Sequence, residues 1–166
     1  VDDLNEMEGV NLPEGVNVVT LTDLSGYHQT SAGWADMRMG EISFDPNGYN
    51  PTWWESAPAH ALTSELISVG EKNMGSAATL TDFIDWSTTN HAADNYALVL
   101  WDHGGGLEGI AWDDTNGHDN LNISEIKSAI DNSTTFSSEN KLDLIGFDAC
   151  LMQTYEIGLE LSSLAD

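Results

Sequence analysis

Two residues that can carry out covalent chemistry each follow an apolar stretch in this sequence. His103 comes just after the run Tyr-Ala-Leu-Val-Leu-Trp at 96–101, and three glycines, 104–106, follow it. Cys150, the single cysteine of the chain, comes just after a second apolar stretch at 142–147. A thiol attacks a carbonyl carbon as its thiolate, which a neighbouring imidazole favours. The pair therefore indicates nucleophilic acyl transfer, if the fold brings the two positions together.

The secondary structure expected around these residues predicts that the fold brings His103 and Cys150 together. The stretch at 96–101 predicts a strand buried on both faces of a parallel sheet, and 142–147 predicts a second buried strand. Between them a helix is expected over 123–131, and another helix is expected over 153–164. Strands that alternate with helices are typical of a parallel α/β sheet, and parallel neighbours end at the same rim. The imidazole and the thiol would meet there.

Other elements follow from the periodicity of apolar residues and from capping signals. The helix over 123–131 has Asn122 as a suitable N-cap and Ile123, Ile126 and Ile130 on one face, and the helix over 153–164 is expected to turn Tyr155, Leu159 and Leu161 inward. Upstream we expect a helix tail over 1–9, with Leu4 and Met7 on one face, and a helix over 79–89 that begins with Thr79 and Asp82. Between these two helices we expect a strand over 17–21, a loop over 22–36, an edge strand over 37–44 and an irregular insertion over 45–60. Residues 65–69 fit a strand or a helix.

The composition limits the partners. The chain of 166 residues has 28 acidic residues and only four lysines and arginines, which gives a formal net charge of −24. Nucleic acids and anionic membranes repel such a surface, whereas a basic substrate is attracted. Acidic surfaces with few lysines also suit high salt, so a halophilic or marine source is expected. No apolar run is long enough to span a membrane, and a single cysteine excludes an internal disulfide.

Each feature also has a simpler interpretation. A lone cysteine is often a small buried hydrophobe, and a histidine at a strand end is often structural. Acyl transfer further needs donors for the developing oxyanion, and the backbone amides of Gly104, Gly105 and Cys150 are candidates. The triple glycine also occurs in esterases, but those need a Gly-x-Ser-x-Gly motif, which this sequence lacks. The acidic loop 113–119 resembles half a calcium loop with its ligands out of register, so a calcium site is possible there but no cofactor is required.

Several blocks of sequence resemble the clostripain-like cysteine peptidases, which are relatives of the caspases and gingipains. The resemblance rests on the segments 3–8, 71–75, 79–83, 96–106 and 145–152. It implies a caspase-like α/β fold, a three-layer sandwich around a mostly parallel central sheet, with 1–166 as a single domain. Relative to the family, the first core strand and the part that follows residue 166 are expected to be missing.

The same resemblance implies an activity and assigns roles to residues. It implies an endopeptidase that cleaves proteins or peptides after arginine or lysine, with His103 as base and Cys150 as nucleophile. Asp148 would bind the basic side chain of the substrate, because a carboxylate pairs well with a guanidinium. Some relatives depend on calcium. An extracellular or cell-surface location is expected.

A second hypothesis is a non-catalytic surface or calcium-dependent binding module that keeps the fold. The acidity and the two Asn-x-Ser/Thr sequons, at Asn122 and Asn132, are compatible with it. The two hypotheses differ in the state of Cys150, since a thiol enclosed by side chains, or one far from His103, would favour the module.

Overall fold

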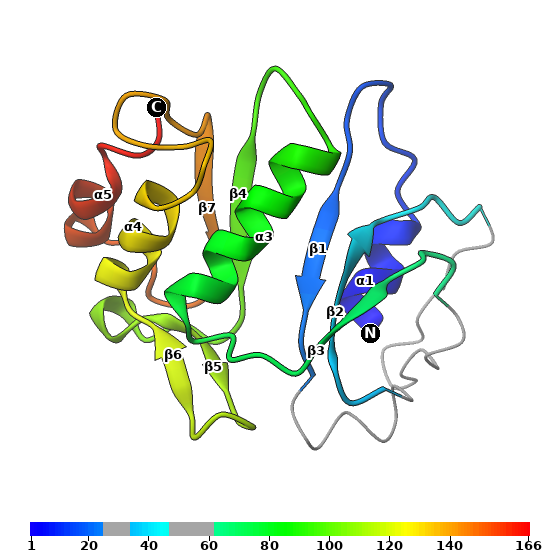
Figure 1. Ribbon diagram of the computed structural model, residues 1–166, viewed down its shortest axis with the longest axis horizontal. Helices are drawn as coiled ribbons and strands as arrows, with labels where there is room; N and C mark the ends of the chain where they lie inside the picture. Colours follow the sequence, from blue (N-terminus) through cyan, green and yellow to red (C-terminus); the bar gives the residue numbers. More distant parts are fainter. Residues whose placement is uncertain (25–33, 47–61) are drawn as a thin grey trace. The chain divides into compact units, whose positions relative to one another are not determined.

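The computed structural model describes residues 1–24, 34–46 and 62–166 (Figure 1). They form two units, Val1–Lys72 and Asn73–Asp166. Most of the insertion expected over 45–60 and most of the loop expected over 22–36 lie outside the described residues. No helix in the described ranges has the length and apolar character needed to cross a bilayer.

In its described residues, the first unit combines one helix with a three-stranded antiparallel sheet. Helix α1 runs over Asp2–Glu8, and the strands are β1 (Val19–Thr22), β2 (Met37–Glu41) and β3 (Ile67–Gly70), in the order β1-β2-β3. The ambiguous segment around 65–69 is therefore a strand. The expected edge strand at 37–44 is shorter and lies in the middle of this sheet, because both β1 and β3 pair with it. Met37 is fully buried there.

Helix α1 buries polar residues that apolar periodicity does not find. Leu4 is buried as expected, but Met7 is exposed, and Asn5 and Glu8 are buried instead. The Glu8 carboxylate accepts hydrogen bonds from the amides of Thr63 and Ser64, with the Ser64 amide at 2.7 Å. A buried carboxylate needs such donors to replace water. The prediction for Met7 was wrong because these hydrogen bonds set which side of the helix is covered.

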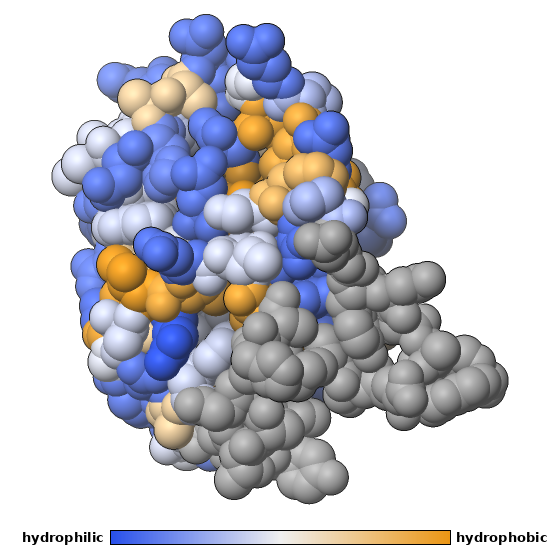
Figure 2. All heavy atoms as spheres, turned by 90° about the vertical axis from the view of Figure 1, so that its right-hand side faces the viewer, coloured by the Kyte–Doolittle hydropathy of each residue, from blue (hydrophilic) through white to orange (hydrophobic). Residues whose placement is uncertain are grey.

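The surface reflects the acidic composition. Figure 2 shows one face on which hydrophilic residues are widespread and apolar residues gather in small patches between them. Exposed apolar side chains of the first unit include those of Val10, Val16, Phe44 and Ile67. In the same unit Asp23 and Glu71, which follow β1 and β3, have carboxylate oxygens within 4.8 Å of each other.

The second unit has a parallel pair of strands with helices packed against it. Its elements are α3 (Ala77–Asn90), β4 (Ala97–Trp101), a 3-10 turn η2 (Gly106–Glu108), β5 (Ile110–Asp113), β6 (Asp119–Leu121), α4 (Ile123–Asp131), β7 (Leu144–Asp148) and α5 (Tyr155–Leu161). Strands β4 and β7 pair in parallel, and β5 and β6 form an antiparallel hairpin. In Figure 1, α3 and α4 lie in front of β4 and β7. The core lies between these helices and strands.

Helix α4 confirms the sequence prediction in detail. It spans Ile123–Asp131, and the Asn122 side chain accepts the amide of Glu125 while the Glu125 side chain accepts the amide of Asn122. The three isoleucines expected on one face are all buried. Such a reciprocal cap satisfies donors that the first helical turn leaves free.

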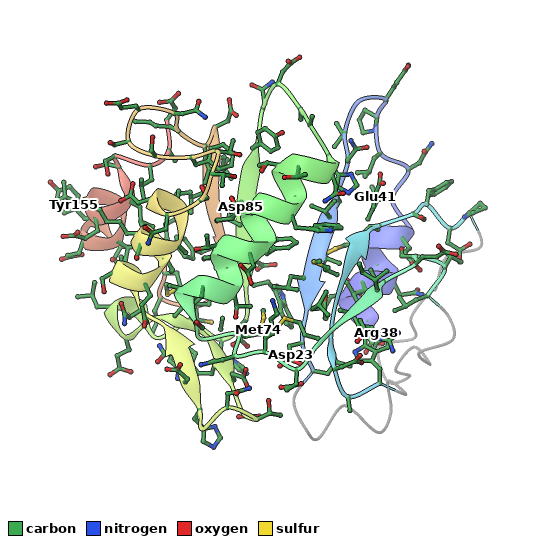
Figure 3. The ribbon with its side chains drawn as sticks, viewed as in Figure 1. Asp23, Arg38, Glu41, Met74, Asp85 and Tyr155 are labelled. Carbon is green, nitrogen blue, oxygen red and sulfur yellow. The ribbon has the colours of Figure 1, made fainter. Side chains whose placement is uncertain are left out.

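The sequence correctly predicts that helix α3 exists, but not the residue at which it begins. It begins at Ala77, with Ser76 as the N-cap residue, so the expected start at Thr79 and Asp82 was wrong. Thr79 is buried inside the first turn instead. Figure 3 labels Asp85, whose carboxylate accepts hydrogen bonds from the Thr134 amide at 2.7 Å and its hydroxyl at 2.9 Å. These bonds connect α3 to the segment that follows α4.

Two predictions about buried faces were wrong. Strands β4 and β7 are each covered on one face only. In β4, Leu98 is buried, whereas Val99 and Trp101 are 58% and 59% exposed, and in β7 no residue is fully buried and Leu144 is 50% exposed. An apolar run cannot tell how many faces are covered, and the helices of this unit pack on one side. In α5, Tyr155 is 80% exposed and Leu159 is also exposed (Figure 3 labels Tyr155).

The buried residues near α5 are instead Ile157, Leu161 and Leu164. Their spacing of four and then three positions marks one helical face, and only Leu161 belonged to the predicted set. The helix begins at Tyr155, after the N-cap Thr154, and ends at Leu161, so it is shorter than the expected 153–164.

Candidate active site

The two strands that precede the candidate residues are direct neighbours. β4 and β7 pair in parallel over five positions, and the last pair in register is Trp101 with Asp148. Beyond it, His103 and Cys150 each come two residues later on their own segments. Because parallel strands run in the same direction, both segments leave the sheet at the same rim. The prediction that these strands are neighbours is confirmed.

The segment after β4 lies against the segment after β7. A Cβ atom placed on Gly104 would overlap the carbonyl oxygen of Cys150 and would lie 2.8 Å from Met152 Cγ and 3.1 Å from Ala149 Cβ. No side chain fits at this position without displacing the backbone around Cys150. The residue next to His103 is therefore in contact with the backbone of the cysteine.

A second set of contacts holds the histidine segment to strand β5. The amide of Trp112 donates to Asp102 Oδ2 at 2.8 Å, on the residue just before His103. On the other side, Gly104 forms a bridge with Ile110, and the Gly105 amide donates to the Gly109 carbonyl at 2.9 Å. The backbone around His103 is thus held on one side through the Asp102 side chain and on the other through the backbone of Gly105.

The candidate oxyanion donors differ in their availability. The Gly105 amide is already used by Gly109 and cannot also serve a substrate. In the described part of the chain, the amides of Gly104 and Cys150 take part in no backbone hydrogen bond. These two remain free to donate to an incoming carbonyl.

The thiol and the imidazole are both accessible. Cys150 is a free, exposed cysteine, and His103 is exposed as well. An exposed thiol can be reached by a substrate, unlike the buried thiol of a structural cysteine. Leu151, the next residue, has a φ of 63°, which is uncommon for a residue with a branched side chain and marks a sharp turn after the cysteine.

Helix α5 begins farther from the cysteine than the sequence suggested. Its N-cap is Thr154, whose hydroxyl accepts the Ile157 amide at 3.3 Å. Four residues therefore separate Cys150 from the first helical residue. The influence of a helix dipole falls off within about one turn, so α5 contributes less at the thiol than a helix starting directly after it.

Asp148, the candidate residue for binding a basic side chain, is exposed at the end of β7. Within the described ranges no hydrogen bond or ion pair involves its carboxylate. The charge is therefore not neutralised by a neighbouring group of the described chain.

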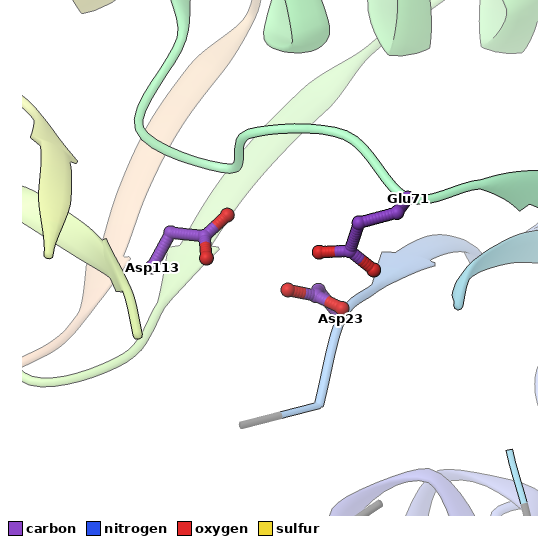
Figure 4. Close-up of side chains that lie close together, drawn as sticks. All are labelled: Asp23, Glu71 and Asp113. Carbon is purple, nitrogen blue, oxygen red and sulfur yellow. The ribbon is translucent and has the colours of Figure 1, made fainter. Parts of the chain in front are cut away.

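Asp113, which sequence analysis placed in a polar loop, is a buried organising residue. It ends β5 and is 2% exposed (Figure 4 labels its side chain). Its carboxylate accepts hydrogen bonds from the amides of Met74, Thr115 and Asn116 at 2.8 to 2.9 Å. Burial raises the pKa of Asp113, but these hydrogen bonds outweigh it, and the pKa is lowered from 3.8. The Asp-x-Thr-Asn pattern, typical of a side chain capping its own turn, was the available signal.

The acidic loop expected over 113–119 is therefore the turn of the β5–β6 hairpin, together with the last residue of β5 and the first residue of β6. Gly117 and His118 have φ angles of 76° and 58°, which close the turn, and β6 begins at Asp119. His118 Nδ1 lies 2.9 Å from an oxygen of Asp114. The carboxylates of this segment thus have partners within the hairpin or just before α3.

Comparison with known proteins connects this arrangement to one family. The sequence profile of the clostripain family matches residues 1–166. Clostripain from Hathewaya histolytica is 29% identical over 184 residues, which cover 96% of this chain and 32% of that protein. The chain thus spans about a third of the length of this relative.

Solved structures of C11 cysteine proteases share the fold. A secreted C11 cysteine protease from Bacteroides thetaiotaomicron, solved in complex with an irreversible peptide inhibitor, matches with a TM-score of 0.71 and 18% identity over 99% of this chain and 41% of that one. An inactive zymogen C11 protease from Parabacteroides distasonis matches with a TM-score of 0.63 and 23% identity over 98% of this chain and 39% of that one. The expected caspase-like α/β fold class is confirmed.

Proposed function

Because the chain belongs to the clostripain family, we propose that the protein is a cysteine endopeptidase with a His103–Cys150 dyad. The observation that carries this proposal is the contact between the two segments: Gly104 packs on the backbone of Cys150, beyond the end of a parallel strand pair. The exposed thiol favours this function over a non-catalytic binding module.

In the proposed mechanism, the imidazole of His103 takes the proton of the Cys150 thiol. The thiolate then attacks the carbonyl carbon of the scissile peptide bond, a carbon–sulfur bond forms, and the carbonyl electrons move to oxygen. As the tetrahedral intermediate collapses, the carbon–nitrogen bond breaks and the imidazolium gives its proton to the leaving amine. Water, deprotonated by the imidazole, hydrolyses the thioester and restores the thiol.

The amides of Gly104 and Cys150 would stabilise the oxyanion in both steps. Both are free of backbone partners, and the approach of Gly104 to Cys150 brings the two segments together. Donors fixed before the reaction stabilise the developing charge without reorganisation. The hydrogen bonds of Asp102 and Gly105 keep the Gly104 segment in place.

We further propose cleavage after basic residues, with Asp148 as the group that binds the arginine or lysine side chain. Its exposed carboxylate lies two residues before the nucleophile, and a carboxylate forms a charge-assisted pair with a guanidinium. The net charge of −24 would also attract basic segments of a protein or peptide substrate.

The proposed function also includes the absence of a required cofactor and an extracellular or cell-surface location. No step of the mechanism uses a metal or cofactor, and calcium would act by stabilising the protein. The relative from Bacteroides thetaiotaomicron is described as secreted, which supports an extracellular or cell-surface location for this protein as well.

Covalent labelling tests the proposal. An arginyl acyloxymethyl ketone should label the wild-type protein at its single cysteine, and Cys150→Ala should abolish labelling while the circular dichroism spectrum stays unchanged. His103→Ala should slow labelling strongly, because the thiolate is no longer formed by the imidazole. Labelling that persists in folded Cys150→Ala, or that is unaffected by His103→Ala, would contradict the mechanism.

A further inference from the structure

An aromatic side chain accompanies Asp148 at the end of the strand pair. Trp101 is the register partner of Asp148, and it is 59% exposed. Residues paired directly across parallel strands place their side chains on the same face of the sheet. Trp101 and Asp148 therefore occupy adjacent positions on one face of the strand pair.

The burial pattern identifies that face. Leu98 and Leu100 of β4, and Ile145 and Phe147 of β7, belong to or pack against the core under the helices. The alternate positions, among them Val99, Trp101, Leu144 and Asp148, are the ones on the opposite face, and all four of these are exposed. Trp101 and Asp148 thus lie at the end of the open face, two residues before His103 and Cys150.

From this placement we propose that Trp101 and Asp148 together form the binding surface for the basic side chain and make it selective for arginine over lysine. The inference rests on the proposed function and adds a second residue to its specificity. A guanidinium is planar and weakly hydrated, so it can stack on the indole while its N–H groups pair with the carboxylate. A lysine ammonium is a compact, strongly hydrated charge that gains mainly from Asp148.

The two residues therefore have separable effects. Asp148 would determine whether a basic residue is accepted at all, since both side chains carry the same charge. Trp101 would determine the preference between them, since only the guanidinium combines stacking with a two-pronged hydrogen bond. A change at Trp101 should alter the ratio of the two substrates, and a change at Asp148 should lower both.

The experiment compares peptide amides that differ only in having arginine, lysine or leucine before the scissile bond, hydrolysed by the full protein. Trp101→Leu should lower the arginine-to-lysine ratio of kcat/KM by about three- to tenfold, mainly through the arginine substrate. Trp101→Phe keeps a ring and should lower the ratio about twofold. Trp86→Leu, which removes an indole from α3, is the matched control and should leave the ratio unchanged.

An unchanged ratio in Trp101→Leu overturns the inference, even if both rates fall together. If the leucine variant does not fold, an unchanged ratio in Trp101→Phe does the same. Failure of the proposed specificity looks different: the wild type would prefer neither basic substrate to a leucyl one, or Asp148→Asn would leave that preference intact. If the wild type prefers basic residues but Trp101→Leu leaves the arginine-to-lysine ratio of kcat/KM unchanged, only the role of Trp101 is excluded.

Discussion

Gly104 and the carbonyl group of Cys150 lie so close together that the position tolerates no Cβ atom. This contact joins the segment that carries the imidazole to the segment that carries the thiol, although the two are distant in the sequence. It also explains why a glycine follows His103 directly. The following Gly106 has a different reason, a φ of 65° in the first residue of η2.

Gly104→Ala should therefore cost both stability and activity. The added methyl group must displace the Cys150 carbonyl or the Met152 side chain, and such overpacking destabilises by about 1–3 kcal/mol. Because the displacement occurs at the nucleophile, we expect peptide hydrolysis to fall about a hundredfold. Urea unfolding and hydrolysis assays measure the two effects.

Gly158→Ala is the matched control for this substitution. Gly158 lies in α5, and nothing lies within 4 Å of the atom that the change adds. Alanine in a helix is more stable than glycine by up to about 1 kcal/mol, so this variant should gain stability and keep full activity. Equal behaviour of the two alanine variants would show that the contact at Gly104 is unimportant.

The reactivity of the thiol provides a test that needs no substrate. Cys150 is the single cysteine, so the rate of alkylation by iodoacetamide reports on this residue alone. At pH 7, His103→Ala should slow alkylation several-fold, because the imidazole no longer stabilises the thiolate. His118→Ala, a change at an exposed histidine of the β5–β6 turn, is the control. Equal rates in wild type and His103→Ala would exclude an ion pair between the two groups.

Asp113 should make the stability of the protein sensitive to acid. Its pKa is lowered from 3.8, so the folded state binds the proton less readily than the unfolded state. The carboxylate therefore contributes its full stability above about pH 4 and loses it as the pH falls through the lowered pKa. Asp113→Asn should lower the free energy of unfolding by about 1–3 kcal/mol at pH 7.

The difference between wild type and Asp113→Asn should then shrink as the pH is lowered towards 2, measured by urea unfolding. Asp114→Asn is the neighbouring control. The Asp114 side chain is more than half exposed and forms an ion pair with the exposed His118, so the change should stay below about 1 kcal/mol. A difference for Asp113→Asn that is independent of pH would contradict the role of the charge.

The elements that carry the candidate site were predictable because their signals are local. The apolar runs of β4 and β7 predict strands, although only one face of each is covered, and strand–helix alternation predicts that they are parallel neighbours. Helix α4 was equally predictable, since Asn122 and Glu125 form a reciprocal cap and the isoleucines share one face. These features depend on residues within a few positions of one another.

What the sequence did not reveal depends on contacts between distant segments. Glu8 is buried because segment 63–64 donates to it, and Asp113 is buried because Met74 donates to it. An acidic residue next to other acidic residues looks like solvated surface until its donors are known. The open face of β4 is a similar case, because Val99 and Trp101 are as apolar as the residues that the helices cover.

The high negative charge of the chain predicts that added salt stabilises the folded protein. Glu156 and Glu160 lie one turn apart on α5, and both are exposed. Like charges at this spacing repel, and Glu160 also faces the negative end of the helix dipole. Glu160→Lys removes both effects and adds an ion pair, so it should stabilise the protein by about 0.5–1 kcal/mol at low salt.

At 1 M NaCl, where the Debye length is about 3 Å, this gain in stability should largely vanish, while the Tm of the wild type itself rises. Thermal unfolding of both proteins at low and high salt measures this, with Glu160→Gln separating the loss of repulsion from the new ion pair. A wild-type Tm that does not increase with salt would show that self-repulsion does not limit the stability of this acidic chain.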